Sequence, residues 1–206
     1  MGSLLTVLML TATLGSLEIH ADGRVIAMPG PSARLKLPKS FESVQERFSN
    51  LNANDYFILH YYAHDIVSGE NKTAWEVAKS AITDPPTYFG LTQVVDNLLT
   101  FEPNNCSMPA GRVQGIRSFT DLHQAAVSVN LNFVVTWPPV RGYSVISVQG
   151  RFSVFDEVRE LSIVGGTGSF TMVRGFALCN SYILNLGTGN SVYEYLLVIR
   201  REPPRV

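Results

Sequence analysis

Asp65 is the residue of this sequence best placed for acid–base chemistry, because it ends a run of alternating apolar residues. The run at 56–66 is rich in aromatic and branched residues, which predicts a β-strand. Alternate residues of a strand face the same side, so Asp65 shares an apolar face with Phe57, Leu59, Tyr61 and Ala63. Desolvation by such neighbours raises a carboxyl pKa and suits the group to proton transfer. The residues alone equally allow Asp65 to cap the strand and face solvent.

The other groups that could support chemistry do not form a recognisable metal or cofactor site. His60 and His64 are four residues apart, which is the spacing of a metal-binding pair on a helix. On a strand the same spacing separates two residues by about 13 Å, too far for both to bind one ion. The run Gly165-Gly166-Thr167-Gly168 lacks the Lys-Ser/Thr of a phosphate loop, so it indicates a turn between two strands. Neither a flavin or nicotinamide fingerprint nor a redox cysteine pair is present, and we expect no cofactor and no metal.

The elements that must position Asp65 are predicted to be strands. The candidates are residues 56–66, 75–82, 89–99, 112–119, 125–137, 143–155, 170–184 and 191–200, of which 75–82 is ambiguous between a strand and a short helix. About eight strands at regular spacing, separated by Pro, Asn and Gly turns, favour an all-β sandwich or barrel. Such a fold, lined by aromatic and aliphatic residues, would be a container for an apolar aromatic ligand and act by orienting it.

The N-terminal residues predict export. Residues 4–14 form an apolar run too short to span a bilayer, and small residues follow up to Ala21. We therefore assign residues 1–21 to a signal peptide, 22–50 to a polar leader outside the core, and 51–202 to the folded β domain. Met1-Gly2 with Thr6 also fits a myristoylation pattern, but the apolar run that follows immediately favours the signal peptide.

Two further features bear on the expected compartment. Asn71 and Asn105 lie in glycosylation sequons, in polar regions that could carry a glycan outside the fold. Cys106 and Cys179 could pair in an oxidising compartment, which the sequence leaves open. The 16 basic and 17 acidic residues form no basic stripe. We expect a protein secreted to the extracellular space, without a membrane or nucleic-acid partner.

Five separated motifs, in order, make the chain resemble the plant dirigent proteins. They are His64-Asp65-Ile66, Val95-Asp96-Asn97-Leu98-Leu99-Thr100, Gly111-Arg112-Val113-Gln114-Gly115, Arg159-Glu160 and Arg174-Gly175. The resemblance covers about residues 54–200. It implies that the domain at 51–202 is an eight-stranded antiparallel β-barrel with a central cavity, assembled as a homo-oligomer, a trimer or a dimer.

The resemblance also implies roles for individual residues. Asp65 would be a general acid or hydrogen-bond partner of a phenolic oxygen, and Arg159 would orient that oxygen. The substrate wall would comprise Phe57, Leu59, Tyr61, Arg117 and Phe152. Two of these positions depart from the lignan-forming pattern: Phe152 stands where those members have a second acid, and Arg117 where an aromatic hydroxyl is common.

The function that follows from the resemblance is stereochemical guidance. Dirigent proteins oxidise nothing themselves; they steer phenoxy radicals, such as those of coniferyl alcohol, made by an external laccase or peroxidase. We expect this activity in lignan and phenylpropanoid biosynthesis and defence, in the apoplast. The alternatives are a non-catalytic cell-wall or defence protein that binds phenolics, and a lyase-like dirigent that closes a ring in a closed-shell phenolic. Phe152 argues against the last, since that chemistry also calls for paired acids.

Overall fold

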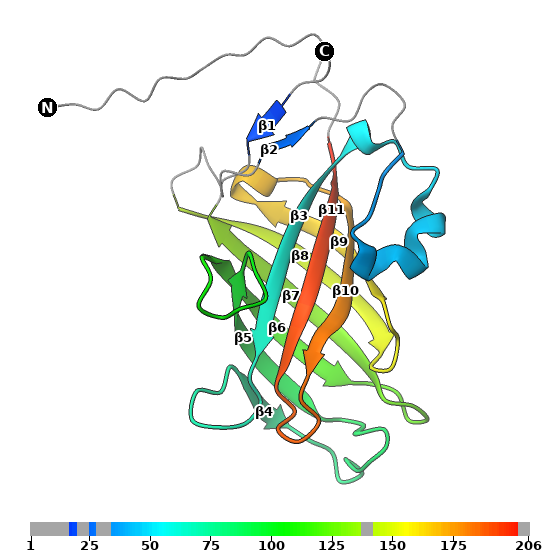
Figure 1. Ribbon diagram of the computed structural model, residues 1–206. Helices are drawn as coiled ribbons and strands as arrows, with labels where there is room; N and C mark the ends of the chain where they lie inside the picture. Colours follow the sequence, from blue (N-terminus) through cyan, green and yellow to red (C-terminus); the bar gives the residue numbers. More distant parts are fainter. Residues whose placement is uncertain (1–16, 20–24, 28–33, 137–141, 202–206) are drawn as a thin grey trace, which may run out of the picture.

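The computed structural model describes residues 17–19, 25–27, 34–136 and 142–201, and in this part of the chain one antiparallel barrel dominates (Figure 1). Eight strands follow one another in the order β3-β11-β10-β9-β8-β7-β6-β5, and β5 pairs back with β3 to close the barrel. Their bounds are β3 Tyr56–Asp65, β5 Thr92–Thr100, β6 Pro109–Phe119, β7 Ala126–Thr136, β8 Tyr143–Ser153, β9 Arg159–Thr167, β10 Gly175–Leu184 and β11 Ser191–Arg200. The eight-stranded antiparallel barrel predicted from the sequence is thus confirmed.

The sequence missed one strand of the barrel and left a second segment ambiguous. Strand β9 was not predicted, because Gly165 and Gly166 indicated a turn; both lie inside β9, and the chain turns afterwards at the short helix η3, Gly168–Phe170. A Cβ on Gly166 would lie 2.5 Å from the carbonyl oxygens of Phe170 and Val145, so this glycine permits close backbone packing. The ambiguous segment forms β4, Ala74–Ala78, which pairs with the first half of β5, whereas β3 pairs with the last residues of β5.

Alternation along each strand separates an apolar interior from a mixed exterior. In β7, for example, Val129, Leu131, Phe133 and Val135 are buried inside, whereas Asn130 and Thr136 are exposed. On β3 the face that ends in Asp65 points inward, as the alternation predicts, and Asp65 lies opposite Ser191 of β11. The register of β3 therefore places a carboxyl group at one end of an apolar interior.

The segment before the barrel packs against its outer face. Helix η1, Lys39–Phe48, buries Phe41 and Phe48 against the outward side chains of Leu178 and Leu196 (Figure 1). The described residues of the segment 22–50, from residue 34 onward, thus lie outside the barrel interior and form a second apolar cluster with its outer face. The segment is polar overall, but burial of its few apolar residues holds it against the barrel.

A polar cluster joins the same helix to the barrel exterior. Glu194 of β11 is buried and accepts hydrogen bonds from Ser40 at 2.9 Å and Asn180 at 3.1 Å, and its Oε1 lies 2.7 Å from Nε2 of His60. Burial alone raises the pKa of Glu194, but the bonds from His60, Asn180 and Ser40 outweigh it and lower the pKa below its usual value.

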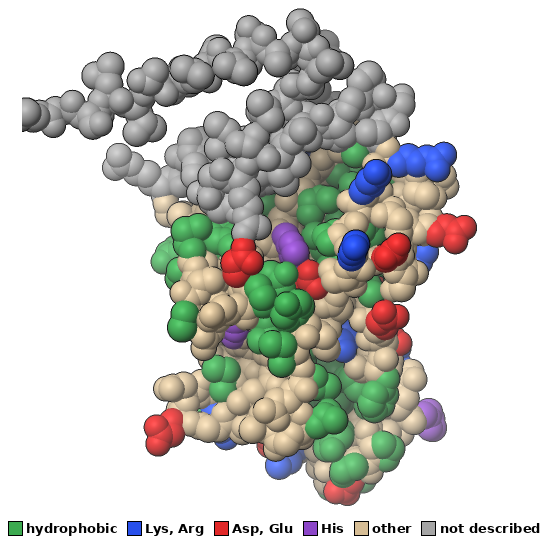
Figure 2. Space-filling model, viewed as in Figure 1, with side chains coloured by type: hydrophobic (Ala, Val, Ile, Leu, Met, Phe, Trp, Pro, Cys, Tyr) green, Lys and Arg blue, Asp and Glu red, His purple; other side chains and the backbone are tan. Residues whose placement is uncertain are grey.

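Two short segments described nearer the N-terminus, β1, Leu17–Ile19, and β2, Val25–Ala27, pair as antiparallel strands. The rest of the predicted signal peptide, with its cleavage site after Ala21, lies outside the described residues. Among the described residues no helix is long and apolar enough to cross a bilayer. On the face seen in Figure 2 the charged side chains are few and dispersed between hydrophobic and uncharged polar ones.

Candidate functional site

A cavity of about 450 Å³ opens at the end of the barrel where β3, β6, β8 and β10 finish and the other four strands begin. Valine and leucine side chains from β5, β6 and β7 contribute to its apolar wall, among them Val95, Val113, Val129 and Leu131. Only three of its lining residues are charged, namely Asp65, Arg117 and Arg159. An apolar container with a few polar groups at fixed positions is the usual form of a small-molecule site.

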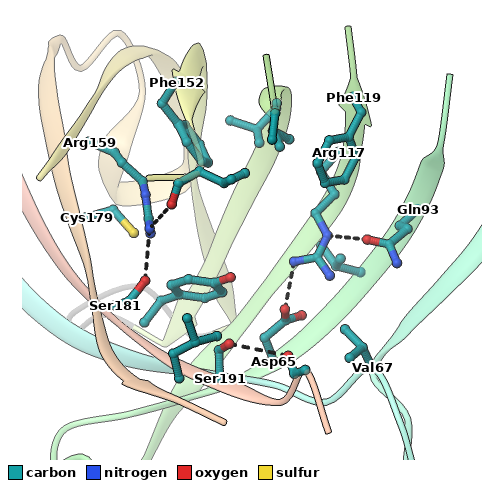
Figure 3. A pocket seen from close by; sticks show the side chains of 18 of the residues that line it. Asp65, Val67, Gln93, Arg117, Phe119, Phe152, Arg159, Cys179, Ser181 and Ser191 are labelled. Atoms are coloured by element: carbon teal, nitrogen blue, oxygen red, sulfur yellow. Dashed lines mark hydrogen bonds and ion pairs between the residues drawn. The ribbon is translucent and has the colours of Figure 1, made fainter. Parts of the chain in front are cut away.

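Asp65 and Arg117 form a buried ion pair on one side of the cavity (Figure 3). The Arg117 Nη1 donates to Asp65 Oδ2 at 2.7 Å, and the side chains of Asp65 and Arg117 are 2% and 17% exposed. The Arg117 Nε donates to Gln93 Oε1, also at 2.7 Å. Burial alone would lower the pKa of Arg117, but the Asp65 carboxylate outweighs it and raises the pKa.

A second chain of hydrogen bonds fixes the other oxygen of Asp65. Asn97 Nδ2 donates to Asp65 Oδ1 at 3.0 Å, and Asn97 Oδ1 accepts from the Thr73 hydroxyl at 2.6 Å. Each carboxylate oxygen of Asp65 therefore has a donor. This excludes the interpretation of Asp65 as a solvent-facing strand cap, because the carboxyl group lies inside the barrel with partners on both oxygens.

Arg159 lies on the other side of the cavity and has a different environment (Figure 3). Its Nη2 donates to the carbonyl of Val154 and the hydroxyl of Ser181, both at 2.9 Å. The rings of Phe152 and Tyr193 lie 5.3 and 5.6 Å from the guanidinium carbon. Its Nε is buried without a hydrogen-bond partner, and no described carboxylate lies within 4.0 Å of Arg159.

Neutral polar groups occupy the space near Arg159. Burial raises the pKa of Cys179 to about 11, even though Arg159 and Tyr195 lower it in part, so the thiol is uncharged at neutral pH. Burial, together with the Asp65 carboxylate, also raises the pKa of Tyr193. Burial raises that of Tyr195 well above its usual value. These side chains can donate hydrogen bonds but carry no charge.

The residues proposed from the sequence divide into two groups. Asp65, Arg117, Phe152 and Arg159 all line the cavity. None of the apolar residues that precede Asp65 on the same face lines the cavity: Leu59 and Tyr61 lie in the barrel core, and Phe57 is partly buried against it. Alternation predicts the face of a side chain but not its depth along the barrel axis.

Several cavity residues were not identified from the sequence. Tyr193 and Tyr195 share the inward face of β11, and Cys179 is their neighbour on β10. The alternation of Tyr193, Tyr195 and Leu197 in the segment 191–200 is a signal that could have placed the two tyrosines inside. Two further lining residues, Gln93 and Asn97, lie four residues apart on β5 and so share its inward face. Both are polar, so no alternation of apolar residues could have indicated that they face the cavity.

The features predicted for export lie at the surface. Asn71 and Asn105, the acceptors of the two sequons, are exposed in turns outside the barrel strands. Cys106 lies in the same exposed turn as Asn105, whereas Cys179 is inside the barrel, and the two cysteines are not joined. The pairing that the sequence left open therefore does not occur in this structure.

Comparison with known proteins identifies relatives over most of the chain. The family model described as Dirigent-like protein matches residues 57–199. Dirigent protein 21 of Arabidopsis thaliana is 39% identical over 142 residues, which cover 68% of this chain and 75% of that protein. Pterocarpan synthase 1 of Glycine max is 32% identical over 139 residues, 66% of this chain and 74% of that protein.

Solved structures agree with the sequence relatives. The pterocarpan synthase dirigent protein GePTS1 superposes with a TM-score of 0.66 at 27% identity, covering 73% of this chain and 87% of that chain. The pterocarpan synthase dirigent protein PsPTS1 superposes with a TM-score of 0.65 at 28% identity, covering 72% of this chain and 96% of that chain.

Proposed function

This chain belongs to the dirigent family, and we propose that it binds monolignol-type phenoxy radicals and imposes stereochemistry on their coupling. The observation that carries the proposal is the apolar cavity with Asp65, Arg117 and Arg159 fixed at its wall. Holding two reactants in one orientation selects which faces meet, and needs no electron transfer by the protein.

The chemistry divides between this protein and an oxidase. An external laccase or peroxidase removes one electron and one proton from each phenol, and passes the electrons to oxygen or peroxide. Two such radicals form one carbon–carbon bond, giving a bis-quinone methide, and no further oxidant is required. The cavity chooses the pair of faces that join, because its wall admits the rings in one orientation.

The polar residues act on the oxygens of the intermediates. Asp65 accepts or returns a proton at a phenolic or quinone-methide oxygen, and its bonds from Arg117 and Asn97 hold it in place. Arg159 orients such an oxygen from the other side. Phe152 stacks against Arg159 and narrows the cavity beside it. The role left for Phe57, Leu59 and Tyr61 is to support the cavity wall through the packing of the barrel core.

The experiment is the coupling of coniferyl alcohol by a laccase, with and without saturating protein. Chiral chromatography of the dimeric products is expected to show an enantiomeric excess only when the protein is present. Dimers that remain racemic at saturating protein would remove coniferyl alcohol as the substrate. The same protein incubated with closed-shell phenolics and no oxidase should give no product, whereas turnover there would favour a ring-closing lyase.

Export and assembly are part of the proposal. We propose that the chain is cleaved after Ala21, carries glycans on Asn71 and Asn105, and works in the apoplast as a homo-oligomer. The exposed positions of both asparagines support glycosylation. Peptide mapping of secreted protein should find a mature N-terminus near Asp22, and light scattering should give the mass of a trimer or a dimer. An intact Met1 or a myristoylated Gly2 would overturn the export proposal.

A further inference from the structure

The charges that line the cavity do not balance. Asp65 and Arg117 neutralise each other in their ion pair, which leaves the guanidinium of Arg159 as the one uncompensated charge among the lining residues. The chain therefore presents a buried site with a net charge of one positive unit at an apolar wall.

Arg159 has no way to remove this charge by itself. A guanidinium does not lose its proton at any pH at which a protein is folded. Its two hydrogen bonds are to a carbonyl and a hydroxyl, both neutral, and its buried Nε has no partner. The rings of Phe152 and Tyr193 stabilise the cation, but an aromatic face is a weaker partner than a carboxylate.

The neighbouring groups do not supply the missing charge either. Cys179 is a thiol and the tyrosines of the cavity are phenols at neutral pH, because burial raises the pKa values of all three. The ring of Phe152, 5.3 Å from the guanidinium carbon of Arg159, is uncharged and supplies no counterion. The negative charge must come from outside the chain.

We infer that the cavity takes phenols that also carry a carboxylate, and that this carboxylate binds the Arg159 guanidinium where it lines the cavity. The inference rests on the proposed function and narrows its substrate class from neutral monolignols to phenolic acids. A carboxylate is ionised at neutral pH, whereas a phenol is not. A charge-assisted bond from the guanidinium where it lines the cavity would supply the counterion that the described residues do not give it.

The test compares ligands that differ in charge but share a ring and a side chain. The probes are ferulate and its neutral methyl ester, with Kd measured by isothermal titration calorimetry. The expected result is that wild-type protein binds ferulate at least about tenfold more tightly than methyl ferulate. Arg159→Met should abolish the preference. Phe152→Glu should abolish it too by giving Arg159 an internal partner, whereas the control Phe152→Leu should keep it.

Each outcome separates this inference from the proposed function. Equal affinities for acid and ester in the wild-type protein overturn the inference, and this comparison needs no variant to fold. A preference that survives in Arg159→Met overturns it as well. If the protein gives stereochemical bias with coniferyl alcohol but binds ferulate and its ester equally, the proposed function is supported and the inference is overturned. Ferulate preference with racemic coupling of both phenols supports the inference and overturns the proposed function.

Discussion

The cavity holds two arginines in opposite situations. Arg117 meets a carboxylate, Asp65, which is itself held by Asn97, so this side of the cavity is complete without a ligand. Arg159 meets a carbonyl, a hydroxyl and two aromatic rings, and one of its nitrogens has no partner. The Asp65 side is therefore held in position before a ligand binds, while the Arg159 side still has a charge without a counterion.

The difference shows why the identity of one residue matters. With an acid at position 152, both arginines would be paired and the cavity would be neutral. With Phe152 the ring lies against Arg159 instead, and the cavity keeps a positive charge. The polar groups of the two sides are thus expected to differ in what they contribute to stability and to binding.

The largest expected effect is on stability, and it should distinguish the two sides. Asp65→Ala leaves Arg117 buried without a counterion, and should lower the free energy of unfolding by about 3–5 kcal/mol. Arg159→Met removes a charge that has no counterion, and should change it by no more than about 1 kcal/mol in either direction. Urea denaturation of both variants measures the two values.

The matched control removes both partners on the paired side. Asp65→Ala combined with Arg117→Met should recover part of the loss, because no unpaired charge remains. If Asp65→Ala and Arg159→Met destabilise the protein equally, the two sides of the cavity do not differ in the way described.

A smaller effect should appear when the unpaired side is given a partner. Phe152→Glu places a carboxylate beside Arg159, so the desolvation penalty should be offset by a new ion pair. In the Arg159→Met background the same change buries an unpaired acid. The double-mutant cycle should give a favourable coupling energy of about 1–3 kcal/mol. A coupling energy of zero would place the residue 152 side chain out of reach of Arg159.

The smallest effect concerns the charge state of Cys179. Its pKa is raised to about 11 in the folded protein, above its usual value of 9.0, so burial of the neutral thiol stabilises the fold fully below pH 9. This contribution should be lost as the pH rises from 9 through 11, because the unfolded chain then releases the proton more readily. The Tm of wild-type protein should therefore fall toward that of Cys179→Ala between pH 9 and pH 11.

Alkylation gives an independent check of the same thiol. At pH 8 iodoacetamide should modify the exposed Cys106 and leave Cys179 almost unmodified. Rapid modification of Cys179 at that pH would indicate a thiolate, and Arg159 would then have an internal counterion.

The sequence predicted the face on which Asp65 lies, because alternation is a local property of a strand. It did not predict that Arg117 rather than Arg159 is its partner. That contact joins β6 to the end of β3, two strands that are not hydrogen-bonded neighbours in the barrel. Pairings across a closed barrel depend on strand order and register, which no local pattern contains.

The errors in the fold have the same origin. Gly165 and Gly166 have the composition of a turn, but both lie in β9, where Gly166 allows close packing against η3 and β8. Phe41 and Phe48 stand in a polar segment, and only the outer face of β10 and β11 explains their burial. In each case the residue packs against a neighbour that is distant in the sequence.

The measurement that tests the central claim most directly is the enantiomeric excess of laccase-driven coupling by wild-type protein and by Asp65→Asn. The substitution keeps the size of the side chain and removes its charge, and circular dichroism should show that the barrel remains folded. If the cavity directs coupling through Asp65, the bias of the wild-type protein should disappear in the variant at saturating concentration. Full enantiomeric excess in Asp65→Asn would contradict the account, because the stereochemistry would then be decided without this carboxylate.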